Sequence, residues 1–131
     1  MKILLIDDHA LIRDALRGLL RELVDDATVL EAPDSRQAMR LLGPHPDLHL
    51  ILLDLNPPDR DGFAVLADLR KRYATISIVV LSAFHDRENI LRALDLGAFG
   101  FIPKSAPREV MANALRLIFS GGRYVPPEAL P

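Results

Sequence analysis

Two stretches decide the fold of this chain: Ile3-Leu4-Leu5-Ile6-Asp7-Asp8 and Leu50-Ile51-Leu52-Leu53-Asp54. In each, an apolar run ends in aspartate. A strand that is apolar at every position is typical of a parallel sheet covered by helices on both faces. Parallel strands present their carboxyl ends at one edge, so we expect the three carboxylates to meet there. Like charges at short distance repel, and a divalent cation between them relieves the repulsion.

The rest of the chain alternates short apolar runs with segments of helical period, which indicates repeated strand–helix units. Strands are predicted near residues 2–7, 27–31, 49–54, 77–82 and 99–102. Helices are predicted near residues 10–24, 34–42, 62–72, 87–96 and 107–120. At 131 residues this pattern indicates one α/β domain.

Two finer expectations concern the helices. One apolar stripe is predicted on the first helix, made of Leu11, Ala15, Leu16, Leu19, Leu20 and Leu23. Gly43 and Gly97 stand where glycines in a left-handed turn commonly end helices.

Composition excludes several classes of function. The net charge of −2 provides no basic field for binding nucleic acid. The chain has no cysteine, which excludes disulfides, thiolate metal sites and thiol catalysis. The apolar run at residues 3–6 is too short for a signal peptide or a membrane span. A cytoplasmic domain without a membrane partner is therefore expected.

Two other predicted strands end in groups that can bind phosphoryl oxygens, the hydroxyl of Ser82 and the amine of Lys104. Taken singly, such residues are more often a satisfied loop hydroxyl and a solvated amine. The pair Asp7-Asp8 can likewise be a helix cap. Asp54 is poorly explained in that way, because no helix begins directly after it. Mg²⁺ suits an open, oxygen-rich edge, and the main-chain carbonyl of Asn56 is a candidate further ligand.

Other catalytic motifs are absent. The sequence contains no G-x-x-x-x-G-K-[ST], no G-x-G-x-x-G after a strand and no G-x-S-x-G. Among the four histidines, His45 and His49 are four residues apart, but they lie outside the predicted helices with Pro46 between them, so they do not form a zinc site on a helix.

The ordered motifs resemble the receiver domain of bacterial response regulators. They are Asp7-Asp8-His9 after the first strand, Asp54 with Pro58 and Asp61-Gly62, Leu81-Ser82-Ala83, and Gly97-Ala98-Phe99-Gly100-Phe101 before Lys104. The resemblance spans residues 1–122. It implies a flavodoxin-like (βα)5 doubly wound parallel sheet with strand order 2-1-3-4-5. Two positions differ from the family's usual pattern: Pro57 stands where the family usually has methionine, and Phe101 stands where tyrosine and phenylalanine alternate. Ser82 in place of threonine is within the family's range.

The resemblance also implies a role for each site residue. Asp54 is the phosphoacceptor, and Asp7, Asp8, Asp54 and the Asn56 carbonyl hold Mg²⁺. Ser82 and Lys104 bind phosphoryl oxygens, and Ser82 with Phe101 forms a switch. The donor is a sensor histidine kinase. The domain is a self-phosphorylating acceptor with slow autodephosphorylation, not a dedicated multiple-turnover enzyme.

The closing residues Gly121-Gly122-Arg123-Tyr124-Val125-Pro126-Pro127 cannot continue a helix. Together with Asp8-His9-Ala10-Leu11-Ile12-Arg13 they resemble the LuxR/NarL-like subfamily, whose receiver precedes a helix-turn-helix. Residues 123–131 are then either a frayed end or the start of a linker to a DNA-binding domain absent from this chain. DNA would be bound only through that domain, with homodimerisation on phosphorylation.

Two alternatives remain at this stage. A degenerate receiver would act as a phosphorylation-independent protein-interaction module. An aspartate-nucleophile phosphatase of the haloacid-dehalogenase type would need Asp-x-Asp at a strand end, and Asp54-Leu55-Asn56 does not provide it.

Overall fold

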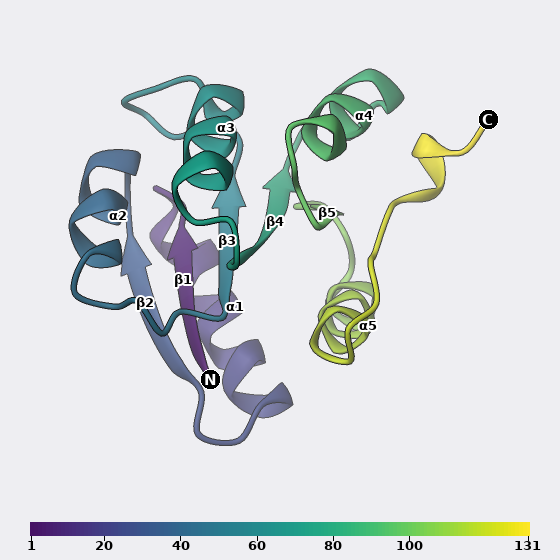
Figure 1. Ribbon diagram of the computed structural model, residues 1–131. Helices are drawn as coiled ribbons and strands as arrows, with labels where there is room; N and C mark the ends of the chain where they lie inside the picture. Colours follow the sequence, from purple (N-terminus) through teal and green to yellow (C-terminus); the bar gives the residue numbers. More distant parts are fainter.

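Five parallel strands form the centre of the computed structural model, which describes residues 1–131 (Figure 1). They are β1 (Lys2–Ile6), β2 (Thr28–Ala32), β3 (Leu50–Asp54), β4 (Ser77–Ser82) and β5 (Gly100–Pro103). Their order is β2-β1-β3-β4-β5. This confirms the flavodoxin-like α/β fold and the strand order 2-1-3-4-5.

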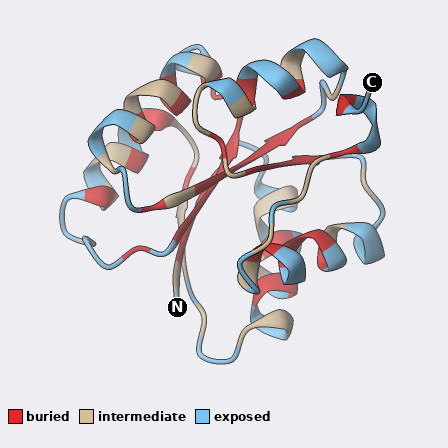
Figure 2. Ribbon diagram, turned by 45° about the vertical axis from the view of Figure 1, so that its right-hand side comes forward, coloured by how far each residue is buried: buried red, intermediate tan, exposed pale blue.

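Five helices cover the sheet in two layers, and a short 3-10 helix follows them. The helices are α1 (Ala10–Leu23), α2 (Ser35–Leu42), α3 (Gly62–Arg72), α4 (Arg87–Asp95), α5 (Arg108–Phe119) and η1 (Pro127–Ala129). One hydrophobic core lies between the sheet and the helices α1 and α5. The other lies between the sheet and the helices α2, α3 and α4. All five residues of β3 are buried (Figure 2), as its unbroken apolar sequence predicts.

Two of the finer expectations about the helices are wrong. Leu11 is 84% exposed and Ala15 is also exposed, so the buried stripe of α1 is limited to Leu16, Leu19 and Leu20. The reason is one of helix face: Ile12 in the first turn packs against the same core, and Leu11 and Ala15 lie to one side of the face that Ile12 and Leu16 present to the sheet. Gly43 has φ −56° and continues a right-handed turn, whereas Gly97 has the expected left-handed φ of +104°.

The chain after α5 packs back onto the domain. Gly121, at φ +95°, reverses the chain direction. Tyr124 then lies beside β5, where its carbonyl accepts a hydrogen bond of 3.0 Å from Phe101 N–H. Ala129 in η1 is only 9% exposed. Residues 123–131 are therefore not a frayed end, and their role as a linker stays a prediction.

None of the helices combines the length and the apolar character that crossing a membrane requires.

Candidate functional site

The carboxyl edge of the sheet brings together side chains from four strand ends. Asp7 directly follows β1, Asp54 ends β3, Ser82 ends β4 and Lys104 directly follows β5. The register aligns Ile6 with Leu53, Asp54 with Leu81, and Ser82 with Pro103. Asp7, Asp54 and Ser82 are each about 1% exposed. Parallel pairing thus places these groups as the strand ends predict.

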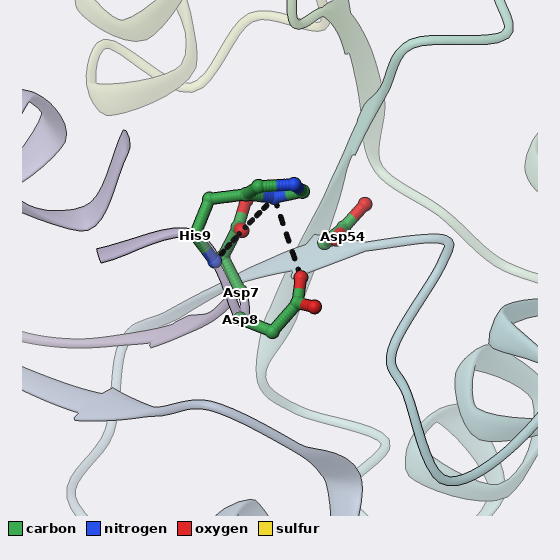
Figure 3. A group of neighbouring side chains, drawn as sticks. All are labelled: Asp7, Asp8, His9 and Asp54. Atoms are coloured by element: carbon green, nitrogen blue, oxygen red, sulfur yellow. Dashed lines mark hydrogen bonds and ion pairs between the residues drawn. The ribbon is translucent and has the colours of Figure 1, made fainter. Parts of the chain in front are cut away.

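The three carboxylates and His9 form one cluster (Figure 3). Asp7, Asp8, His9 and Asp54 each offer a ligand atom, and these atoms lie within 4.8 Å of one another. Asp7 Oδ2 and Asp54 Oδ2 are buried, yet neither accepts a hydrogen bond of good geometry. Buried carboxylate oxygens normally accept hydrogen bonds, because desolvating them otherwise costs free energy, and the Lys104 amine is the one positive charge that these two oxygens share. The cluster therefore fits a hard divalent cation.

Lys104 supplies a positive charge next to these carboxylates. Its Nζ lies 2.8 Å from Asp7 Oδ2 and 3.1 Å from Asp54 Oδ2, and its side chain is only 11% exposed. Its backbone is held by the hydrogen bond from Lys104 N–H to Ser82 O, of 2.8 Å. The lysine thus bridges the two most buried carboxylates.

The electrostatic environment of Asp54 disfavours its ionised form. Burial raises the pKa of Asp54 above its ordinary value. A hydrogen bond from Asn56 N–H to Oδ1, of 3.2 Å, and the charge of Lys104 both act in the opposite direction. The neighbouring charge of Asp7 adds to the increase in pKa. A further positive charge beside Asp54 would therefore favour its ionised form.

An open cavity of about 380 Å³ lies over the site. Its lining includes His9, Asp54, Asn56, Ala83 and Lys104. The cavity gives a ligand access to Asp54 from solvent, although the residue itself is buried. Asn56 therefore stands at the site, and the ligand role of its carbonyl stays a prediction.

The loop after β3 is fixed by a close backbone approach. A Cβ added at Gly62 would lie 1.8 Å from the carbonyl oxygen of Leu55. Only glycine fits there, which ties the start of α3 to the end of β3. The loop between Leu55 and Gly62, which carries Asn56, therefore has its two ends in direct contact.

Ser82 and Phe101 hold defined positions. Ser82 Oγ accepts a hydrogen bond from Phe84 N–H at 3.0 Å and donates one to Phe84 O at 3.2 Å. Its hydroxyl is thus satisfied by the loop after β4. Phe101 is fully buried, in the core that α4 shares with the sheet. Their pairing as a switch stays a prediction.

His9 is the site residue that sequence reasoning misses. Its Nδ1 lies 3.0 Å from Asp7 Oδ1 and 3.3 Å from Asp8 Oδ1, and its backbone N–H donates to Asp7 Oδ1 at 2.8 Å. The available signal is its position directly after the acidic pair, because a test for helical histidine spacing does not detect neighbours in a loop.

Comparison with known proteins identifies a family. Residues 3–116 match the family described as the response regulator receiver domain. The chain is 42% identical over 129 residues to a glycerol metabolism activator of Pseudomonas putida, covering 98% of this chain and 58% of that protein. It is 30% identical over 129 residues to the transcriptional regulatory protein DegU of Brevibacillus brevis, covering 98% and 54%. The chain thus spans little more than half the length of these relatives.

Solved structures agree with the fold. A LuxR family DNA-binding response regulator from Silicibacter pomeroyi has a TM-score of 0.84 at 32% identity, covering 97% of this chain and 98% of that one. A LuxR family two-component response regulator from Aurantimonas has a TM-score of 0.85 at 27% identity, covering 98% and 91%.

Proposed function

The chain belongs to the family of response regulator receiver domains, and from this premise we propose that Asp54 is its phosphoacceptor. The observation that carries the proposal is the position of Asp54. It is a buried carboxylate at the carboxyl edge of the sheet, 3.1 Å from the lysine amine and open to a cavity. No other aspartate combines these features, because Asp7 does not line that cavity and Asp8 is half-exposed.

The proposed reaction is an in-line displacement at phosphorus. A carboxylate oxygen of Asp54 attacks the phosphoryl group of a kinase phosphohistidine, the P–N bond breaks, and the imidazole leaves. Asp7, Asp8, Asp54 and the carbonyl of Asn56 would hold Mg²⁺, which supplies positive charge to the phosphoryl oxygens. Lys104 exchanges its contact with Asp54 for one with a phosphoryl oxygen. Slow hydrolysis of the acyl phosphate restores the carboxylate.

The proposed switch uses the hydroxyl of Ser82. That hydroxyl has one proton to donate, which now goes to Phe84 O. A phosphoryl oxygen on Asp54 is a charged and stronger acceptor. Ser82 would turn toward it and vacate space into which Phe101 rotates. The acyl phosphate shifts this equilibrium because it interacts unequally with the two arrangements.

The output is proposed to be transcription regulation through a further domain. The relatives named above include an activator and a transcriptional regulatory protein, and this chain spans only part of their length. A net charge of −2 supports a domain that does not itself bind DNA. The partners proposed are a sensor histidine kinase and a second copy on phosphorylation. The comparisons give no support to a degenerate receiver.

The test is incubation with acetyl phosphate and Mg²⁺ followed by mass spectrometry. The expected result is one added phosphoryl group, lost in Asp54→Ala and kept in Asp25→Ala, which removes an exposed aspartate outside the site. An adduct that persists in Asp54→Ala would refute the assignment. Omission of Mg²⁺ is expected to slow the uptake strongly.

A further inference from the structure

Residues Arg123–Leu130, called the strap below, run from the end of α5 along β5 to α4 (Figure 1). The turn that starts this path is specific. Gly122 N–H donates to Leu117 O at 2.9 Å, and a Cβ on Gly122 would lie 2.5 Å from a Leu117 methyl carbon. The chain is thus directed onto the domain rather than away from it.

The first part of the strap is fastened to β5 and to the residues before it. Phe101 N–H donates to Tyr124 O at 3.0 Å. Gly100 allows this approach, because a Cβ there would lie 3.1 Å from the same oxygen. The Arg123 guanidinium donates to Phe99 O at 2.9 Å and to Ala98 O at 3.0 Å. The backbone of Phe101 is therefore a direct partner of the strap.

The far part of the strap is fastened to α4 and to the loop before it. Glu128 Oε2 lies 2.8 Å from His85 Nδ1. Arg87 Nε donates to Ala129 O at 3.4 Å. Ala129 is 9% exposed and belongs to the same buried core as Phe101 and Ile90. The strap thus contacts the domain at two sites that are separate in sequence.

Both fastening sites adjoin Ser82. His85 directly follows Phe84, whose N–H and carbonyl are bonded to the Ser82 hydroxyl. Phe101 lies on β5, which pairs with β4 through Val80 and Phe101. The hydrogen bonds between Ser82 and Phe84 thus give a direct route from Ser82 to the strap, through His85.

We propose that phosphorylation of Asp54 loosens the far part of the strap from α4 and from the loop before it, so that the strap reports the state of the site; the inference rests on the proposed function. The Ser82 hydroxyl cannot donate its single proton to Phe84 O and to a phosphoryl oxygen at once. When it turns to the phosphoryl group, the loop of residues 83–86 loses the hydrogen bond that Ser82 donates to Phe84 O. His85 is then no longer held in a fixed position opposite Glu128. The strap then loses one of its two fastenings.

Coupling of this kind is reciprocal. If a phosphoryl group at Asp54 weakens docking of the strap by some factor, then the form with the strap released binds that group more tightly than the docked form by the same factor. The affinity at Asp54 in strap variants is therefore a test that does not depend on how far the strap moves. The probe is BeF3⁻ with Mg²⁺, which stands in for a phosphoryl group on the aspartate.

Two measurements test the inference on the whole chain. Hydrogen–deuterium exchange of the peptide that contains residues 122–131 is expected to become faster when BeF3⁻ and Mg²⁺ are added. The affinity for BeF3⁻ is expected to rise about fivefold or more in Ala129→Glu, which puts a carboxylate into the buried core. Leu130→Glu is the matched control, because it adds the same charge at a residue that is 67% exposed, and its affinity is expected to be unchanged.

Glu128→Gln provides a milder variant that keeps the core intact. It removes only the negative charge from a half-exposed contact with His85, so BeF3⁻ affinity is expected to rise by at most about fivefold. Its strap peptide is also expected to exchange faster without BeF3⁻.

Failure of the strap proposal and failure of the proposed phosphoacceptor function give different results. Bound BeF3⁻ is detected independently by ¹⁹F NMR, with Asp54→Ala as the control that gives no bound signal. If BeF3⁻ binds, but strap exchange and the affinities of both strap variants are unchanged, the inference is overturned and the proposed function stands. If BeF3⁻ does not bind and acetyl phosphate gives no adduct, the proposed function fails and the inference fails with it.

Discussion

Replacing Lys104 with methionine tests how the domain tolerates its carboxylates without a metal. The variant keeps a long apolar stem and removes the only cation within ion-pair distance of both Asp7 and Asp54, at 2.8 and 3.1 Å. Each contact is worth roughly 5 kcal/mol of gross attraction at an effective dielectric constant of 20. Most of that is offset by the desolvation of the amine. Removing one partner from a buried ion pair typically costs about 3–5 kcal/mol.

We therefore expect Lys104→Met to lower the free energy of unfolding by about 3 kcal/mol in a chelator. For a chain of this size the melting temperature would fall by roughly 12 °C. Mg²⁺ is expected to stabilise the variant more than the wild type, because the cation replaces the missing charge and no longer competes with the amine. The deficit should also shrink at acidic pH, because protonation of Asp54, whose pKa is raised by burial, removes one of the two charges that the amine neutralises.

The assay is urea unfolding followed by circular dichroism, with and without Mg²⁺. Lys71→Met is the control, because Lys71 is exposed and far from the site in the fold. Adding Asp54→Asn to Lys104→Met should recover part of the loss, since one unpaired carboxylate is then removed. A variant as stable as the wild type in chelator would refute the idea that the lysine neutralises the metal-free site.

Three further predictions concern single residues. Asp54→Asn is expected to stabilise the metal-free domain near neutral pH. Folding raises the pKa of Asp54, so the wild type loses stability as pH rises through that raised pKa. Urea titrations at several pH values should show that the gain in the variant vanishes below the ordinary aspartate range. Asp8→Asn is expected to weaken Mg²⁺ binding in calorimetry and to slow phosphorylation, because the metal loses a charged ligand; unchanged affinity would contradict its role. Phe101→Ala is expected to cost about 3–5 kcal/mol of stability because the ring is fully buried, and a loss below about 1 kcal/mol by calorimetric melting would contradict that packing.

The sheet and the gathering of its strand ends could be predicted because they depend on simple patterns. Unbroken apolar runs such as Leu50–Leu53 require cover on both faces, and parallel strands then place Asp7 and Asp54 at one edge. Leu11 could not be predicted correctly, because apolar residues on adjacent faces leave the edge of the buried face open: Ile12 packs against the core, whereas Leu11 is exposed.

The details that escaped prediction depend on long side chains and on close approaches. The Lys104 amine can reach several acceptors, and its bridge between Asp7 and Asp54 follows from the three-dimensional positions of both. The docking of Tyr124 beside Gly100 needs the absence of a side chain on one strand and a carbonyl from a distant segment. A sequence rich in glycine and proline indicates that a helix ends, but does not indicate where the chain goes next.

The bond between Tyr124 and Phe101 has a consequence for solubility. β5 ends the sheet on one side, and outward amide and carbonyl groups on such a strand are a template for pairing with another chain. One backbone hydrogen bond of 3.0 Å and the strap above it shield that template. On the proposal made above, activation frees the far part of the strap, and this four-residue strand is then covered only by the residues around Tyr124. A phosphorylated domain that meets no partner is then the form most exposed to aggregation.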